Sequence, residues 1–249
     1  MEYWQLLLLF AVGVASGFLN VIAGGGSTLA LPVLIFMGLD SALANGTNRI
    51  AILIQNVAAV SSFRQQAVSE FKESLKLAVW TLPGAIAGAF LAVNTSDAWF
   101  QNILAIVMIG IIFSMVYTPS ETNRPPGESG KHKEWLAYPV LLATGLYGGF
   151  IQVGVGFLFM ATLFHLLKMD LVRVNMHKVF TVLIYTLPAL AIFIATGNVN
   201  WILGLVLAAG SAIGGWCAAR ASVKGGEKAI RILLIIAMAI MVLKLFRFF

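Results

Sequence analysis

The chain is poor in the residues on which most metal-binding and redox proteins depend. Its 249 residues include one cysteine, Cys217, and three scattered histidines. A single cysteine excludes an intrachain disulfide, and the histidines have no metal-ligand spacing. The sequence also lacks a nucleophile–base pair, a phosphate-binding loop or paired carboxylates in a convincing setting. We therefore expect a protein that is not an enzyme and that needs no cofactor.

Charge is equally scarce. Asp, Glu, Lys and Arg make up 10% of the residues and hydrophobic residues 60%, whereas about a quarter of a soluble protein is charged. Charge-poor stretches follow one another, and about 20 apolar residues cross a bilayer as a helix. The net charge is +6, and the basic residues lie between these stretches. Basic residues in the loops of a membrane protein indicate its topology and not a nucleic-acid-binding surface. The sequence predicts an all-α polytopic membrane protein whose surroundings are the lipid bilayer.

Ten hydrophobic segments can be marked along the chain. In the first half they are 3–23, 27–38, 42–63, 75–93 and 98–118, and in the second 136–153, 156–168, 172–195, 200–221 and 228–248. A polar linker at 119–135 separates a first transmembrane repeat, 1–118, from a second, 136–249. The second and seventh segments would be only about 20 Å long as helices, too short for a comfortable crossing. Both begin at glycines, so we expect half-helices or re-entrant arms.

The two halves repeat one pattern 130 residues apart. Four pairs align at this offset without a gap: Gly24 with Gly154, Gly26 with Gly156, Asp40 with Asp170, and Asn45 with Asn175. Lys and Arg concentrate in alternate loops, which places these loops in the cytoplasm. Because five segments per half is an odd number, the second repeat would have the opposite orientation to the first. Inverted repeats with interrupted helices are typical of secondary transporters, whose site lies between the halves.

Arg49 and Lys178 are cations inside apolar segments. Each costs at least about 2.5–3.5 kcal/mol in a membrane, so each needs a partner or a wet cavity. We predict that the two cations coordinate an anion near the pseudo-twofold axis. The alternatives are snorkelling toward the headgroups, or a salt bridge with Asp40 or Asp170.

Glycines and polar residues near these cations are the other candidates. Glycines permit a helix break, after which free N–H groups and a positive dipole end suit an anion. The same glycines would also allow close helix packing, and the amides could equally join helices. His177 is a candidate proton carrier, and Asp40 and Asp170 are expected helix N-caps. The candidate substrate-binding residues besides Arg49 and Lys178 are Gly24, Gly25, Gly26, Ser27, Asn45, Asn48, Gln152, Gly154, Gly156, Asn175 and His177; Asn20, Gln55 and Asn56 share the apolar setting.

Two motifs resemble a known family. The run GFLNVIAGGGSTLALPVLIFMGLDSALANGTNRIA at 17–51 is similar to the first-repeat signature of the TauE/SafE sulfite exporters. GLYGGFIQVGVGFLFM at 145–160, with HKV at 177–179, resembles its second-repeat signature, although the family is usually richer in glycine or proline around Gln152. The resemblance implies a bacterial inner-membrane permease that exports a small sulfur-containing anion such as sulfite or an organosulfonate.

The leading hypothesis is an alternating-access carrier of a small anion. The competing hypotheses are an anion channel and a non-transporting membrane scaffold. The coupling ion, H⁺ or Na⁺, stays open, and the apolar helices would permit a homodimer.

Overall fold

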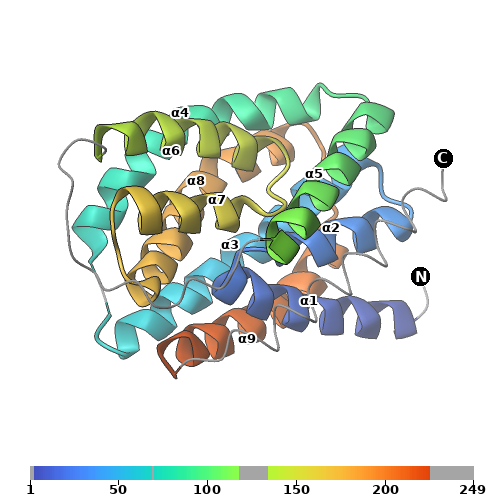
Figure 1. Ribbon diagram of the computed structural model, residues 1–249. Helices are drawn as coiled ribbons and strands as arrows, with labels where there is room; N and C mark the ends of the chain where they lie inside the picture. Colours follow the sequence, from blue (N-terminus) through green and yellow to red (C-terminus); the bar gives the residue numbers. More distant parts are fainter. Residues whose placement is uncertain (1–2, 69, 118–133, 225–249) are drawn as a thin grey trace.

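The computed structural model describes residues 3–68, 70–117 and 134–224, and in these ranges the chain is all helical, with no strand (Figure 1). The predicted tenth segment and the polar stretch up to residue 133 lie outside the described residues. The helices in chain order are α1 (Tyr3–Ala23), α2 (Ser27–Phe36), α3 (Ser41–Gln65), α4 (Phe71–Val93), α5 (Asp97–Tyr117), α6 (Glu134–Phe150), α7 (Val155–Ala161), the π-helix η1 (Thr162–Leu166), α8 (Leu171–Ala195) and α9 (Trp201–Lys224).

Four of these helices are long and apolar enough to cross a membrane: α1, α4, α8, and α9 from Trp201 to Ser222. Shorter apolar helices lie at Ser27–Phe36, Asp97–Ile111 and Val155–Leu166. The short second and seventh segments therefore occur where the glycines predicted them, the latter as α7 continued by η1. The described part of the chain is a multi-pass helical membrane protein.

Helix α3 is long but polar. It has 25 residues, and Asn45, Asn48, Arg49 and Asn56 on it are all buried. An apolar helix can face lipid, whereas these side chains need partners inside the protein. α3 accordingly lies in the interior, in contact with α8 and α9.

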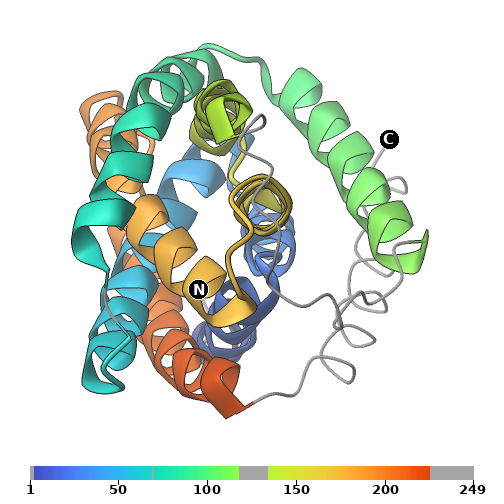
Figure 2. The same cartoon turned by 60° about the vertical axis from the view of Figure 1, so that its left-hand side comes forward.

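The bundle is built from helix pairs that join the two halves of the chain. α1 lies along α9, and α4 lies along α6, on opposite sides of the molecule (Figures 1 and 2). α3 and α8 pack against each other, and each also packs against the fourth helix of the other half, α9 and α4 respectively. The short helices α2 and α7 lie between the two outer pairs (Figure 1).

Small residues let the paired helices approach closely. A Cβ added to Gly17 of α1 would lie 2.7 Å from the Cα of Ser211 on α9, and one added to Gly149 of α6 would lie 2.7 Å from the Cα of Ala85 on α4. Such small-residue interfaces drive helix association in membranes, where no hydrophobic effect acts between helices.

We expect Gly17→Ala to lower the free energy of unfolding by about 1–3 kcal/mol, because the methyl group has to push α1 and α9 apart. Gly110→Ala on α5 is the matched control, since no described atom lies within 4 Å of its added Cβ. The measurement is apparent melting temperature in detergent by size-exclusion chromatography. Equal melting temperatures for the two variants would contradict the close α1–α9 contact.

Candidate functional site

The two helix breaks touch each other at the centre of the bundle. α1 ends at Ala23 and α2 begins at Ser27, while α6 ends at Phe150 and α7 begins at Val155. Gly24 and Gly154 have φ values of +77° and +70°, which glycine adopts without steric cost. A Cβ on Gly24 would lie 2.5 Å from the Cα of Gly156. The breaks are therefore in direct backbone contact, with no side chain between them.

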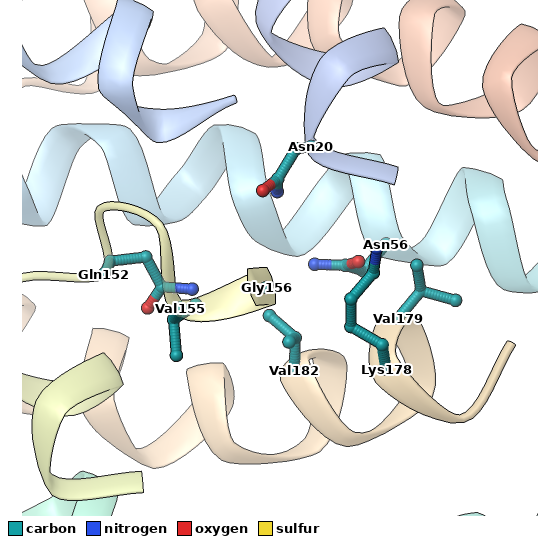
Figure 3. Close-up of a pocket in the computed structure, with 8 residues that line it drawn as sticks. All are labelled: Asn20, Asn56, Gln152, Val155, Gly156, Lys178, Val179 and Val182. Atoms are coloured by element: carbon teal, nitrogen blue, oxygen red, sulfur yellow. The ribbon is translucent and has the colours of Figure 1, made fainter. Parts of the chain in front are cut away.

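A small cavity lies beside this contact (Figure 3). Its volume is about 10 Å³, about enough for one water molecule. Both halves of the chain contribute to its wall, through α1, α3, the break before α7, the start of α7, and α8. The residues that line it are Asn20, Asn56, Gln152, Val155, Gly156, Lys178, Val179 and Val182.

Lys178 brings a positive charge to the cavity. Its side chain is 2% exposed, and its Nζ donates hydrogen bonds to Val21 O and Asn175 Oδ1, both at 2.7 Å. Val21 lies in the last turn of α1, where helix carbonyls lack intrahelical partners and the dipole favours a cation. Among the described residues of the cavity wall, Lys178 is the charged one.

Arg49 has a different position. It is fully buried, and its guanidinium donates from Nη2 to Gly148 O at 3.2 Å and to Gly149 O, and from Nη1 to Gln152 Oε1 at 3.1 Å. The guanidinium carbon also lies 4.7 Å from the centre of the Phe193 ring. Arg49 therefore holds the carboxyl end of α6 and is absent from the described cavity wall.

The two cations make equivalent contacts with opposite halves. Arg49, on the third helix of the first half, binds the end of α6, and Lys178, on the corresponding helix of the second half, binds the end of α1. Asn45 adds to the first contact by donating from Nδ2 to Phe150 O at 2.7 Å. The structure thus places the predicted pair at two separate helix ends, and brings only Lys178 to the cavity.

Gln152 connects Arg49 with the cavity. It has a φ of +62°, an uncommon conformation for a residue other than glycine and one often found at functional sites. Its Oε1 accepts from Arg49, and its Nε2 donates to the hydroxyl of Tyr185 at 3.0 Å. Because Arg49 occupies the oxygen, the amide nitrogen is directed toward Gly156, as Figure 3 shows.

Asn20 and Asn56 complete the polar wall of the cavity. Asn56 Nδ2 donates to Ile52 O at 2.8 Å, and Asn20 Nδ2 donates to Gln55 Oε1 at 3.3 Å. Their place in apolar segments is a sequence signal that does not separate site residues from helix-pairing amides. The valines of the wall and Tyr185 have no such signal, because these residue types are ordinary in membrane helices.

Most other candidates surround the cavity without lining it. Gly25 O accepts from Thr28 Oγ1, and Gly26 O accepts from Ser16 Oγ at 2.8 Å. Ser27 is buried at the start of α2. The Nδ2 of Asn48 is buried with no hydrogen-bond partner among the described residues. Asn175 accepts from Lys178, three residues later on the same helix α8, and its Nδ2 donates to Ser222 Oγ on α9 at 2.9 Å.

His177 belongs to a separate cluster between α8 and the start of α4. Its Nδ1 lies 2.8 Å from Ser74 Oγ, and its Nε2 lies 3.3 Å from Glu70 Oε2. Glu70 also forms an ion pair with Arg173 at 2.5 Å, and this hydrogen bond lowers the pKa of the Glu70 carboxyl. The predicted proton carrier therefore faces these groups and is not in the described cavity wall.

Both predicted N-cap aspartates immediately precede a helix. Asp170 accepts hydrogen bonds from Val172 N and Arg173 N, both at 3.0 Å, so its N-cap prediction is confirmed. Asp40 has the N-cap position of α3, but its side chain makes no capping hydrogen bond. Asp97 of α5 caps this helix instead, by accepting from Ser41 N at 2.5 Å.

Comparison with known proteins places the chain among membrane transporters. A "Probable membrane transporter protein" of Haemophilus influenzae is 25% identical over 242 residues, which are 96% of this chain and 94% of that protein. "Probable membrane transporter protein YfcA" of Escherichia coli K12 is 28% identical over 243 residues, 96% of this chain and 88% of its own. No solved structure matches the chain with significance. The profile of the family described as "Sulfite exporter TauE/SafE" matches residues 9–245, and the chain therefore belongs to this family of membrane transporters.

Proposed function

We propose that the protein is an alternating-access permease that exports a small sulfur-containing anion, such as sulfite or an organosulfonate, across the bacterial inner membrane. One observation carries the proposal. Lys178, which is 2% exposed, lines a cavity at the point where the two helix breaks touch. A buried cation in a membrane helix beside interrupted backbone is the arrangement expected of a substrate site.

The cavity wall is suited to an anion because hydrogen-bond donors face it. Figure 3 shows the amide nitrogens of Gln152 and Asn56 directed toward the space near Gly156. Together with the Lys178 ammonium, these groups can donate to the oxygens of a sulfite or sulfonate group. The described wall contains no carboxylate that would repel an anion. The family description, which names sulfite, supports the same substrate class.

Backbone geometry supports two structurally equivalent halves. Three pairs of residues with positive φ are separated by the same 130 residues: Gly24 with Gly154, Gly38 with Lys168, and Ala67 with Gly197. By their order in each half, α1 corresponds to α6 and α4 to α9. The contact of α1 with α9 therefore corresponds to the contact of α6 with α4. An inverted repeat of this kind would move as two bodies that rock about the site.

The size of the cavity favours a carrier over a channel. A volume of about 10 Å³ holds about one water molecule, and a sulfite ion has four non-hydrogen atoms. The anion therefore has to enter in a conformation that separates Gly24 from Gly156. Such a rearrangement is what an alternating-access carrier undergoes, whereas an open channel keeps a continuous path.

Transport by purified protein in proteoliposomes tests the proposal. We expect saturable uptake of radiolabelled sulfite, accelerated several-fold when unlabelled sulfite is loaded inside, because counterflow requires a carrier that returns occupied. Uptake that neither saturates nor shows counterflow would indicate a channel. If the protein takes up neither sulfite, methanesulfonate nor any other small anion, the result would contradict the transport proposal and favour the scaffold hypothesis.

A further inference from the structure

We propose that His177 is a proton-binding site and that its protonation loosens the contact between α8 and the start of α4, which opens one end of the molecule. The His177 cluster, made of His177, Ser74, Glu70 and Arg173, joins these two helices. The role of this cluster as a gate for an anion rests on the proposed function. Its response to pH can be measured without any substrate.

The position of the His177 ring favours the neutral imidazole. The residue is fully buried, and its Nε2 makes no hydrogen bond with a described residue, although Glu70 Oε2 lies 3.3 Å away. The same carboxylate oxygen already accepts from Arg173 at 2.5 Å. A proton on Nε2 would therefore bury a second positive charge beside a carboxylate that is already paired. Burial of a charge without a partner of its own is costly.

The charged groups around His177 do not remove this cost. Those that act on the ring are Glu70, Glu73 and Arg173. Glu73 is exposed in the first turn of α4, so water screens its charge. The buried cations Arg49 of α3 and Lys178 of α8 donate to carbonyls at the ends of α6 and α1. The ring therefore takes up a proton most easily after α8 has moved away from α4 and water has reached Nε2.

The equivalent contact in the other half of the repeat has no titratable side chain. At the offset of 130 residues, His177 corresponds to Thr47 and Glu70 to Asn200. These residues are also in contact, because Asn200 N donates to Thr47 Oγ1 at 2.9 Å. One of the two contacts can therefore change its charge with pH, and the other cannot.

Backbone geometry supports the equivalence of the two contacts. The turn before α4 and the turn before α9 each contain a residue with positive φ, Ala67 and Gly197. The turns also make the same backbone hydrogen bonds at this offset, from Val68 N to Phe63 O and from Asn198 N to Phe193 O. The His177 cluster and its neutral counterpart therefore join corresponding helices of the two halves.

The two contacts lie at opposite ends of the molecule. The starts of α4 and α8 are at the same end of the bundle (Figure 1). α3 ends where α4 begins, so the start of α3, which carries Thr47, lies at the other end. The end with the His177 cluster carries Arg64 and Lys72, and basic residues of this kind predict the cytoplasmic side. Acid would therefore loosen the predicted cytoplasmic end alone.

A movement of α8 at this end would reach the cavity directly. Lys178 follows His177 on α8, and it lines the cavity together with Val179 and Val182. A displacement of α8 away from α4 would carry this part of the wall with it. In the proposed permease, protonation of His177 would therefore open the cavity toward the predicted cytoplasmic side.

Cysteine labelling at matched positions tests this gate. Thr181 lies one helical turn beyond His177 on the same face of α8, and Ala51 lies one turn beyond Thr47 on α3, since residues four apart share a helix face. Thr181 and Ala51 are each 1% exposed. Thr181→Cys and Ala51→Cys are each combined with Cys217→Ser, so that each protein carries one thiol. The rate of modification by 2-(trimethylammonium)ethyl methanethiosulfonate is measured in detergent at two pH values, about 8 and about 5.5, on either side of the ordinary histidine pKa.

The ratio of the two rates corrects for the pH dependence of thiol chemistry. We expect the rate at Thr181→Cys to rise about 10-fold relative to that at Ala51→Cys on acidification. An imidazole in water titrates near pH 6.5, and a proton that binds only the open form shifts the equilibrium by about this factor. His177→Gln in the same proteins removes the titrating group and should hold the ratio constant. A constant ratio in the presence of His177, or an equal rise with His177→Gln, would overturn the proposal.

Thermal stability gives a second measurement in case a cysteine variant does not fold. A ring that is neutral in the folded protein and protonated after unfolding destabilises the fold as the pH falls through about 6.5. On the same acidification, the apparent melting temperature of the wild-type protein should therefore fall by about 3–6 °C more than that of His177→Gln. Equal falls in the two proteins would contradict a buried neutral imidazole.

Transport separates this proposal from the proposed function. If the labelling ratio rises on acidification but the protein transports no anion, the proton-dependent contact stands and the proposed permease fails. If the protein transports an anion but the ratio stays constant, the permease stands and the proton-binding gate is wrong. If both are observed, His177→Gln should also remove the pH dependence of sulfite counterflow over this range, and counterflow that keeps its pH dependence would contradict a gate at His177.

Discussion

Lys178→Met should reduce substrate flux by about 10- to 150-fold while the protein still folds. A hydrogen bond to a charged group contributes about 1.5–3 kcal/mol, and each 1.4 kcal/mol corresponds to about a factor of ten. Methionine has nearly the length of lysine, so the substitution removes the ammonium without opening a large void. The effect should appear in the initial rate of sulfite or methanesulfonate uptake, normalised to the amount of reconstituted protein.

Stability measured on the same preparations separates binding from folding. Lys178→Met leaves Val21 O and Asn175 Oδ1 without their donor, which should cost about 1–3 kcal/mol. Lys72→Met, at an exposed position in the first turn of α4, is the matched control and should change neither flux nor stability. Wild-type flux in Lys178→Met would mean that the ammonium serves only to cap α1.

Arg49→Met should act on folding first. The guanidinium donates to Gly148 O, Gly149 O and Gln152 Oε1, and all of these acceptors would stay buried without a partner. Each buried acceptor that loses its donor costs about 1–3 kcal/mol. At about 2–4 °C per kcal/mol, the apparent melting temperature should fall by roughly 10 °C. We expect low yield in the membrane and early unfolding in size-exclusion measurements.

Two comparisons sharpen this result. Arg173→Met removes an arginine whose ion pair with Glu70 is partly exposed, at 44% and 39% of the side-chain areas, so it should cost at most about 1 kcal/mol. Arg49→Lys keeps the charge but cannot reproduce the planar fork of donors, so it should restore only part of the lost stability. An Arg49→Met protein that melts like the wild type and fails only in transport would assign Arg49 to the anion site.

Arg49 also affects the cavity through Gln152. With Arg49 in place, the amide oxygen of Gln152 accepts from the guanidinium and the nitrogen faces Tyr185 and the cavity. Without it, the amide could turn and present its oxygen, an acceptor that would repel an anion. The folded fraction of an Arg49→Met preparation should therefore also bind substrate less tightly than the wild type. A residue that only stabilised α6 would leave this affinity unchanged.

The order and approximate limits of the described helices could be predicted from the sequence. Hydrophobic runs and glycines are local signals, because a helix in lipid needs about 20 apolar residues and a break needs residues that tolerate unusual backbone conformations. The short segments at α2 and at α7 with η1 were visible for this reason. The 130-residue spacing of the glycines reappears in the positive φ values of Gly24 and Gly154.

The sequence by itself determined that this is a helical membrane protein with two broken helices and two intramembrane cations. It could not determine which cation would line a cavity, because their partners lie far away along the chain. Gly149 is 100 residues from Arg49, and Val21 is 157 residues from Lys178. Only the packing of α3 and α8 against the opposite half brings these helix ends within hydrogen-bond distance. That packing places Arg49 on the carbonyls at the end of α6 and Lys178 at the cavity. A charge inside a membrane needs polar partners, and the tertiary structure decides which carbonyls lie near enough to supply them.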